Sequence, residues 1–361
     1  MTKRRTICFI NSVKSWGGGE KWHFEMALRL KNNGHNIIFI CRKNSELAKK
    51  LIGTDVYVKN FEVHNLSFLN FYKINKIRKF LKSNRVDIAI MNFSADIKTA
   101  GPAAKLAGVK RIIYRRGSAI PIKNSILNRF LFKKVLTDII ANSEATKKTI
   151  LQNNPNLFDS EKIRVIYNGI DIDKTEGKIL YKRRNNEIVL GNAGRLVHQK
   201  GQHYLIEIAK ALKEKGINFT LLIAGNGPLE SELTEQIKKA DLENEIKLLG
   251  FVKNINEFMR SIDIFLLTSL WEGFGFVLAE AMLNKKPIVA WDISSNPELV
   301  NHNVNGYLAP PFKVEIFTQQ ILNLIENTEQ QIAFGEKGKA IAEAKFSYEE
   351  TTNQLCRFLH I

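Results

Sequence analysis

The sequence has few cysteines and no long hydrophobic run, and these two absences exclude several classes of protein. Its 361 residues include 3 cysteines, an odd number without the spacing of metal ligands. A disulfide framework is therefore not expected, and reduced thiols fit the cytosol. No apolar run reaches the roughly 18 residues that a membrane-spanning helix needs. The first residues lack a small-residue cleavage site, so we expect them to lead into a strand and not to form a signal peptide.

Acidic residues are scarce in the first half of the chain only. Residues 1–170 carry 32 Lys and Arg against 11 Asp and Glu, whereas residues 171–361 carry 22 against 25. A basic half predicts contact with an anionic surface such as nucleic acid, acidic lipid or a phosphorylated glycan. The alternative is solvated charge from a compositional bias towards Lys and Asn, although such a bias should affect both halves alike.

Short β-branched runs alternate with longer helical patterns along the chain, which predicts parallel sheets covered by helices on both faces. The expected strands lie at 6–10, 36–40, 86–91, 111–114, 138–142, 163–167, 187–192, 219–225, 246–250, 263–267 and 287–291. The clearest expected helices lie at 20–32, 71–83, 202–215, 229–240 and 313–326.

The polar segment 171–186 interrupts this alternation and is typical of a linker. We therefore expect an α/β protein with two doubly wound domains, residues 1–170 and 187–345, and a closing helix at 346–361. Ligands in such folds bind beyond the carboxyl ends of the strands, so the cleft between two such domains is the expected site.

Three consecutive glycines, Gly17, Gly18 and Gly19, follow the first expected strand in SWGGGEKWHF. Glycines at this place let backbone N–H groups approach an anion at a helix N-terminus. Their spacing is not that of the nicotinamide-binding motif, and no acidic residue ends the second strand, where FICRKN stands. We expect contact with a phosphate or a sugar; a plain flexible turn is the alternative.

Two basic residues follow the strand at 187–192 in the loop GRLVHQKG. Arg195 offers a planar fork for phosphate oxygens and Lys200 a point charge. Together they are able to neutralise a diphosphate, which matters where the diphosphate is a leaving group. The nearby histidines have no carboxylate cluster around them, so a metal site is not expected.

Two further strand ends in the second half are candidates for contact with a nucleotide. Gly225, Asn226 and Gly227 form a strand-to-helix turn, a weak signal by itself. Phe251 and Val252 follow the next strand, at an edge where a nucleotide base has room to lie.

The stretch SLWEGFGFVLAEAM places two carboxylates, Glu272 and Glu280, around an apolar helix start. Neither has an obvious partner nearby, so each needs one from elsewhere in the fold or from a substrate. Gly273 and Gly275, on either side of Phe274, free the backbone for a phosphate at this helix N-terminus. Glu280 is placed to accept hydrogen bonds from ribose hydroxyls, as acidic residues do in other nucleotide sites. An ion pair with one of the two lysines that follow is the alternative.

These motifs occur in the order and spacing of retaining glycosyltransferases of family 4, which the chain resembles over nearly its whole length. GGGE, ANSEATKK and VIYNGID add to the likeness. The resemblance implies two Rossmann-like domains of the GT-B fold, with a nucleotide sugar bound mainly by the second. It also implies that the closing helix at 346–361 crosses back and packs on the first domain. It implies that Arg195 and Lys200 hold the diphosphate and Glu280 the ribose, while Glu272 contacts the donor sugar beside the backbone amides of the glycine turn.

One position departs from this family pattern. Many members carry a His after the strand that matches RIIY, close to the donor sugar, where this chain has Arg116. An arginine stays protonated and cannot act as a general base, so we expect Arg116 to hold a phosphate or an acidic sugar. Retaining transfer in this fold is thought to let the leaving phosphate assist deprotonation of the acceptor, which needs no enzymic base. The expected catalytic residues are therefore Arg195, Lys200, Glu272 and Arg116.

No cofactor or metal is expected beyond the nucleotide-sugar substrate. The acidic pair in DID, residues 171–173, is part of an Asn-Gly-Ile-Asp junction, and the resemblance implies chemistry without a metal. Two segments, 70–82 and 121–136, interleave apolar and basic residues. They predict basic amphipathic helices on an anionic membrane surface. The alternative is an apolar stripe that faces the core, with a solvated basic face.

The implied function is transfer of a sugar from a nucleotide sugar to a glycan or lipid-linked acceptor, in lipopolysaccharide core or cell-surface polysaccharide synthesis. Such an enzyme is expected in the cytoplasm, peripheral at the inner face of the membrane. A nucleotide-sugar 2-epimerase of the same fold is one alternative. A basic nucleic-acid-binding protein is another, although no helix-turn-helix, zinc-finger or RNP-like motif supports it, and no nucleic-acid partner is expected.

Overall fold

The structure is a computed structural model that describes residues 4–173 and 177–361. The chain divides into two compact units, the first formed by residues 1–169 and 349–361 and the second by residues 170–348. Of the segment expected to be a linker, residues 174–176 lie outside the described residues, and the remainder groups with the second unit.

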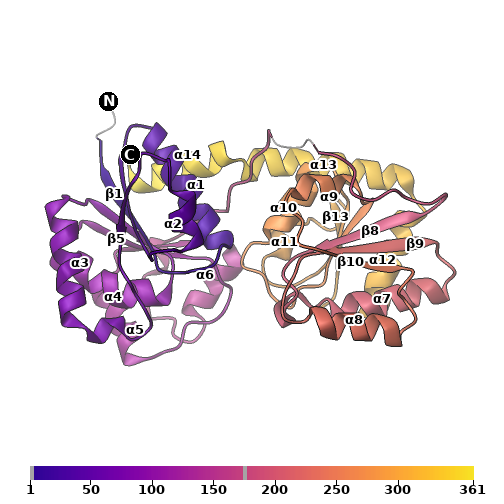
Figure 1. The fold of residues 1–361 in the computed structure, drawn as a ribbon, viewed down its shortest axis with the longest axis horizontal. Coiled ribbons are helices and arrows are strands. Elements are labelled where there is room, and N and C mark those ends of the chain that lie inside the picture. The colour runs from indigo at the N-terminus through magenta and orange to yellow at the C-terminus, as the bar shows by residue number, and fades with distance from the viewer. Residues whose placement is uncertain (1–3, 174–176) are drawn as a thin grey trace. The chain divides into compact units, whose positions relative to one another are not determined.

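The first unit, whose residues up to 169 run from indigo to magenta in Figure 1, is built on a parallel sheet with the strand order β3-β2-β1-β4-β5-β6-β7 in the described part of the chain. Its strands are β1 (Thr6–Asn11), β2 (Asn36–Cys41), β3 (Tyr57–Asn60), β4 (Ile88–Met91), β5 (Arg111–Arg116), β6 (Asp138–Ala141) and β7 (Ile163–Val165). Its helices are α1 (Gly18–Asn32), α2 (Glu46–Lys50), α3 (Phe71–Ser83), α4 (Ser94–Leu106), α5 (Ile126–Phe130), α6 (Glu144–Leu151) and α14 (Tyr348–Leu359), with a π-helical turn at Leu131–Val135 and short 3-10 turns at Ser67–Leu69 and Ser160–Lys162.

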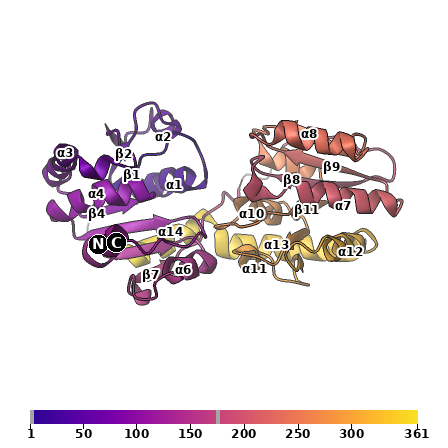
Figure 2. The ribbon, with the colours of Figure 1, turned by 90° about the horizontal axis from the view of Figure 1, so that it is seen from below.

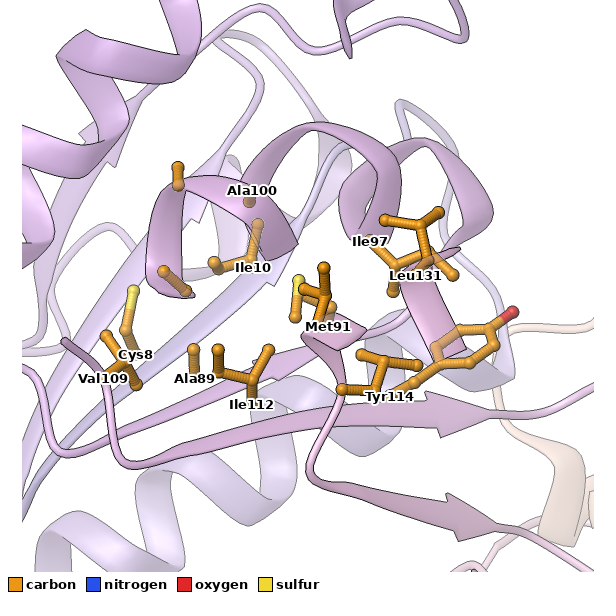
Figure 3. Close-up of a cluster of buried hydrophobic side chains, with 14 of the residues drawn as sticks. Cys8, Ile10, Ala89, Met91, Ile97, Ala100, Val109, Ile112, Tyr114 and Leu131 are labelled. Carbon is orange, nitrogen blue, oxygen red and sulfur yellow. The ribbon is translucent and has the colours of Figure 1, made fainter. Parts of the chain in front are cut away.

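Helices cover both faces of this sheet because its central strands, such as β1 and β4, are apolar on both sides. Figure 3 shows one face, where Cys8 and Ile10 of β1 and Met91 of β4 meet Ile97 and Ala100 of α4 in the buried core. The opposite face is covered by α1 and by α14, which contact each other where the Thr352 hydroxyl lies 3.7 Å from the sulfur of Met26.

The second unit is built on a parallel sheet with the order β10-β9-β8-β11-β12-β13. Its strands are β8 (Ile188–Ala193), β9 (Phe219–Ala224), β10 (Ile246–Gly250), β11 (Ile264–Leu267), β12 (Ile288–Trp291) and β13 (Gly306–Ala309). Figure 2 shows its helices from below; they are α7 (His203–Glu214), α8 (Glu230–Lys239), α9 (Ile255–Arg260), α10 (Phe276–Leu283), α11 (Asn296–Leu299), α12 (Val314–Ile325) and α13 (Thr328–Phe346), with a 3-10 turn at His198–Lys200. The core between α7, α8, α12 and the sheet is apolar.

The expected strands and helices agree with the observed ones to within two residues at each end. Two strands were not predicted. β3 has the sequence YVKN, lies at the sheet edge and is only partly buried, so its pattern is that of a surface segment. β13 has the sequence GYLA and lies at the other sheet's edge. Short edge strands carry little of the continuous hydrophobicity that marks central strands.

The two basic amphipathic segments divide between core and surface. In α3, Ile74 and Ile77 are buried, so the alternative of a core-facing stripe holds for this helix, whereas Phe71 at its start is 82% exposed. In the second segment Leu131 is buried, while Ile126 is 78% exposed. Among the described residues, none of the helices has both the length and the apolar character that crossing a bilayer requires.

Candidate active site

The strand order of each sheet reverses at one position, and parallel α/β folds bind ligands beyond the carboxyl ends of the strands beside such a position. In the second unit the reversal lies between β8 and β11. The loops that leave these two strands, 194–202 and 268–275, therefore share one edge of the sheet. They carry the expected residues Arg195, Lys200 and Glu272.

Lys200 and Glu272 form an ion pair at this edge. The Lys200 Nζ donates to Glu272 Oε1 at 2.5 Å, and the Ser269 hydroxyl donates to the same oxygen at 2.7 Å. The two side chains of the pair are 16% and 7% exposed. Of the two kinds of partner expected for Glu272, one elsewhere in the fold or a substrate, the structure contains the first: Lys200 lies 72 residues earlier in the sequence. A buried carboxylate requires such a partner, and no pattern within one segment could reveal it.

Backbone hydrogen bonds hold the Arg195–Lys200 loop between its neighbours. On one side, the N–H of Leu270 donates to the carbonyl of Gln199 at 2.8 Å. On the other side, the N–H of Leu196 donates to the carbonyl of Asn226 at 3.0 Å. The Arg195–Lys200 loop is thus fixed both to the loop that carries Glu272 and to the Gly-Asn-Gly turn after β9.

The glycines of that turn are needed because the two loops are in backbone contact. A Cβ on Gly225 would lie 1.9 Å from the carbonyl oxygen of Gly194, and Gly225 also has a φ of 137°. A Cβ on Gly227 would lie 2.3 Å from the carbonyl oxygen of Leu196. Gly225, Asn226 and Gly227 therefore support the Arg195 loop directly, whatever else they contact.

The other expected donor residues lie at this edge or beside it. Arg195 is exposed, and its guanidinium has no partner among the residues that the structure describes. Gly275 adopts a φ of 78° as the residue before α10, a conformation that favours glycine. Glu280 lies half-buried in α10, and the ammonium of Lys285 pairs with Glu336. Phe251, 74% exposed, and Val252 follow β10, which is the edge strand on the other side of β9.

In the first unit the Gly17 to Gly19 turn lies at the reversal between β1 and β4, and Arg116 ends β5, the strand next to β4. Gly17 precedes α1, and a Cβ on Gly19 would lie 2.3 Å from the side-chain nitrogen of Asn92, which follows β4. The guanidinium of Arg116 donates to the Tyr114 hydroxyl at 3.0 Å and to the carbonyl of Ile120. Arg116 is thus held by its own strand and the loop that follows.

A buried polar network under the glycine turn was not predicted. Arg115, the neighbour of Arg116, is 2% exposed and donates to the side-chain oxygens of Asn92 at 3.2 Å and Asn168 at 2.5 Å. Its guanidinium also lies 5.1 Å from the ring centroid of Trp22. Glu20, 3% exposed, accepts from the Asn11 side chain at 3.0 Å. Glu20 belongs to GGGE and Asn168 to VIYNGID, so these two motifs were the signal in the sequence that pointed to the network.

Burial shifts the protonation of this network. The pKa of the Glu20 carboxyl is raised, chiefly by loss of solvent, although the bond from Asn11 opposes the shift. Burial raises the pKa of Asp96, near the start of α4, to about 7, and the Glu20 charge adds to this effect. Burial also holds the pKa of His23 well below its usual value, with the Arg115 charge adding to the shift. The first unit therefore has a cluster of buried groups at the carboxyl ends of β1 and β4.

The described residues contain no group of three or more His, Cys, Asp or Glu side chains able to hold a metal ion. The DID segment at 171–173 is not part of such a group.

Two sequence models of known families match the chain. The model described as Glycosyltransferase Family 4 matches residues 16–174, and the one described as Glycosyl transferases group 1 matches residues 173–341. An uncharacterized glycosyltransferase of Methanocaldococcus jannaschii is 31% identical over 343 residues, which are 92% of this chain and 92% of the relative. The chain belongs to glycosyltransferase family 4.

Two other proteins extend the comparison. The crystal structure of Anabaena HepE in complex with UDP and glucose has a TM-score of 0.82 and 25% identity, and covers 98% of this chain and 99% of that one. An Escherichia coli protein named UDP-Gal:alpha-D-GlcNAc-diphosphoundecaprenol alpha-1,3-galactosyltransferase is 27% identical and covers 82% of each chain. The expected fold, two Rossmann-like domains of the GT-B type, is confirmed, and the chain is a glycosyltransferase. The alternative of a 2-epimerase is not supported.

Proposed function

We propose that this family 4 glycosyltransferase moves a hexose from a nucleotide sugar to a glycan or lipid-linked acceptor of a cell-surface polysaccharide, with retention of configuration and without a metal. The ion pair between Lys200 and Glu272 is the observation that best supports the proposal. It joins the two loops that leave β8 and β11, at the position where such sheets bind ligands. The named relative acts on a diphospho-linked acceptor, which is consistent with this class of substrate.

Lys200 is placed to stabilise the leaving diphosphate while it holds Glu272. An ammonium has three N–H donors, and Glu272 Oε1 uses one of them. The others are able to face phosphate oxygens, together with the exposed guanidinium of Arg195. As the bond to the sugar breaks, negative charge grows on the phosphate oxygens, so cations fixed before the reaction lower the barrier.

Glu272 serves a different part of the donor in this proposal. Its second oxygen, and the backbone amides of the Gly273 to Gly275 turn, face the hexose, while Glu280 in α10 accepts from the ribose hydroxyls. Each contact is a hydrogen bond that a water molecule would otherwise make, so it selects for geometry more than for affinity. In the first unit, Arg116 and the Gly17 to Gly19 turn are proposed to contact the transferred sugar or its phosphate.

A panel of UDP-, GDP- and ADP-sugars tests donor binding by thermal shift. One nucleotide sugar of the panel should raise the melting temperature in EDTA as much as in Mg²⁺. Release of the free nucleotide from this donor should depend on the presence of an acceptor. No stabilisation by any nucleotide sugar would overturn the proposed function, and stabilisation only with Mg²⁺ would overturn its metal independence.

Two variants separate donor binding from transfer. Glu280→Ala should raise the dissociation constant of the nucleotide sugar about tenfold, the equivalent of one charge-assisted hydrogen bond. Lys200→Ala should slow turnover by 10² to 10³, on the order of the loss of one group that stabilises the transition-state charge. Lys210→Ala is the control, since this lysine is exposed on α7. Unchanged kinetics in both site variants would contradict the residue assignment.

A further inference from the structure

The first unit contains a cavity of about 670 Å³ that the proposed donor site does not use. It opens at the carboxyl ends of β1 and β4, and its lining includes Ser12, Lys14, Arg42, His64, Leu66 and Ser94. Two of these side chains, Lys14 and Arg42, are cations. A cavity at the strand reversal of a parallel sheet is where this kind of fold binds small molecules.

The charges in the cavity favour an anion. Lys14 is exposed and forms no ion pair with any residue that the structure describes. Arg42 is 17% exposed, and its Nε donates to Glu62 at 3.1 Å. The same carboxylate lies 3.9 Å from His64, so Glu62 neutralises one cation, and Lys14 and the outer N–H groups of Arg42 are left for a ligand. A lysine beside an arginine is a combination suited to phosphate oxygens.

The rim of the cavity is apolar and continues out from Leu66. Leu66, Leu69, Phe71 and Tyr72 are 70%, 63%, 82% and 77% exposed, and they lie within seven consecutive residues. Soluble surfaces rarely gather so many large apolar side chains in one place without a partner. We name residues 66–72 the apolar rim.

The apolar rim is held in place by the rest of the loop. The Lys73 ammonium donates to the Ser67 hydroxyl at 3.1 Å and to the carbonyl of Glu62. The Ser67 hydroxyl accepts from the N–H of His64 at 2.9 Å, and Val63 is buried in the core. Because these bonds fix the loop, Phe71 and Tyr72 project into solvent from an ordered base.

The surroundings of the rim are basic. Residues 63–86 contain six Lys and Arg and no Asp or Glu. On α3, Lys76, Lys79 and Lys82 are exposed, while the apolar stripe of the helix faces the core. Apolar side chains that project from a basic surface are the pattern that binds an anionic lipid surface.

We propose that this cavity and the apolar rim together bind a lipid-linked acceptor: its phosphate group lies against Lys14 and Arg42, and its apolar chain stays in a lipid surface that Leu66, Leu69, Phe71 and Tyr72 enter. The proposal rests on the proposed function, since it names the class of acceptor. It commits to a phosphate-bearing lipid, whereas a soluble glycan would use neither the rim nor the cations.

Vesicle co-flotation with the full chain tests the proposal. The probes are vesicles of phosphatidylcholine alone, of phosphatidylcholine with phosphatidic acid, which carries a phosphate monoester, and of phosphatidylcholine with phosphatidylglycerol, at matched surface charge. Wild-type protein should bind the phosphatidic acid vesicles most tightly. Lys14→Ala and Arg42→Ala should each lower that binding about fivefold, the effect of one basic residue near an anionic surface, and remove the preference over phosphatidylglycerol. Lys43→Ala, which removes an exposed cation outside the cavity lining, should keep the preference.

The rim is tested in the same assay. Phe71→Ser with Tyr72→Ser should weaken binding to both kinds of anionic vesicle, whereas Ile332→Ser, which removes a 62% exposed side chain from α13, should not. Equal binding to both anionic lipids with no effect of Lys14 or Arg42, or no vesicle binding at all, would overturn the inference. The panel of nucleotide sugars, run on the wild-type chain without vesicles, tests the proposed function separately. The proposed function and the lipid-binding inference can therefore be contradicted independently of each other.

Discussion

At the scale of single residues, close backbone contact determines which residue is tolerated at Gly227, in the proposed donor site. The loop that carries Arg195 and the turn that follows β9 approach so closely that Gly227 has no room for a side chain: a Cβ would lie 2.3 Å from the carbonyl oxygen of Leu196. The carbonyl belongs to the backbone, so the clash is relieved only by moving the loop itself.

Gly227→Ala should therefore lower the free energy of unfolding by about 3 kcal/mol, the upper range for overpacking, and weaken nucleotide-sugar binding because the Arg195 loop moves. Gly216→Ala is the control. Gly216 has a φ of 73° with open space around it, so its variant should lose only the ~1 kcal/mol of a left-handed backbone and keep donor affinity. Urea unfolding and a donor titration measure both. Equal stability losses in the two variants would contradict the argument.

Most of the proposed donor-site residues follow strands that hydrophobicity predicts, so the sequence indicates the edge of the sheet at which they lie. What it could not provide is the contact between distant segments. The sequence left open whether the partner of Glu272 lies in the fold or in a substrate, and Lys200 neutralises it from another loop. Arg115 and Arg116 are adjacent and chemically alike, but alternate residues of a strand point to opposite faces. One of them is buried in a network, and the other bonds to its own loop.

At the scale of elements, the buried carboxylate near the start of α4 links helix stability to pH. Asp96 accepts from the N–H of Phe93 at 3.1 Å and is fully buried, and its pKa is raised from its usual value near 4 to about 7. Between these two values the folded state binds a proton that the unfolded state has lost. Stability from this group is therefore full below about pH 4 and declines as pH rises to about 7.

Asp96→Asn should remove this dependence, because an amide keeps the acceptor oxygen and does not ionise. The free energy of unfolding of the wild type, minus that of the variant, should fall between pH 4 and pH 7 in urea titrations. Asp55→Asn, a change at a 98% exposed side chain, should show no such trend. A difference between wild type and variant that stays constant or rises with pH would contradict the assignment. His23 has a lowered pKa, so its contribution to stability is lost as pH falls, but both proteins contain His23 and the difference cancels this opposite trend.

At the scale of the whole molecule, the chain returns to the first unit at its end, although residues 170–348 form the second unit. Residues 349–361 group with the first unit, where Arg111 donates to the carbonyl of Phe358 at 2.6 Å and its guanidinium lies 4.5 Å from that residue's ring centroid. Helical periodicity predicted only that a final helix exists, since an apolar stripe such as that of Leu355 and Leu359 fits any open face. That this helix packs on the first unit was implied by the family resemblance alone.

The unfolding of each unit can be followed separately by tryptophan fluorescence, because Trp22 lies in the first unit and Trp291 in the second. Leu355→Ala removes a fully buried side chain from α14 and should lower the free energy of unfolding seen by Trp22 by about 3 kcal/mol, while the transition seen by Trp291 stays in place.

Leu324→Ala, an equally buried change in α12 of the second unit, should do the reverse, and a bound nucleotide sugar should raise the transition that Trp291 reports more than the one that Trp22 reports. Urea unfolding of variants in which one of these two tryptophans, together with Trp16 and Trp271, is replaced by Phe measures each transition. If Leu355→Ala shifted the Trp291 transition as much as the Trp22 transition, the last helix would stabilise both units, and the division of the chain into independently unfolding parts would be wrong.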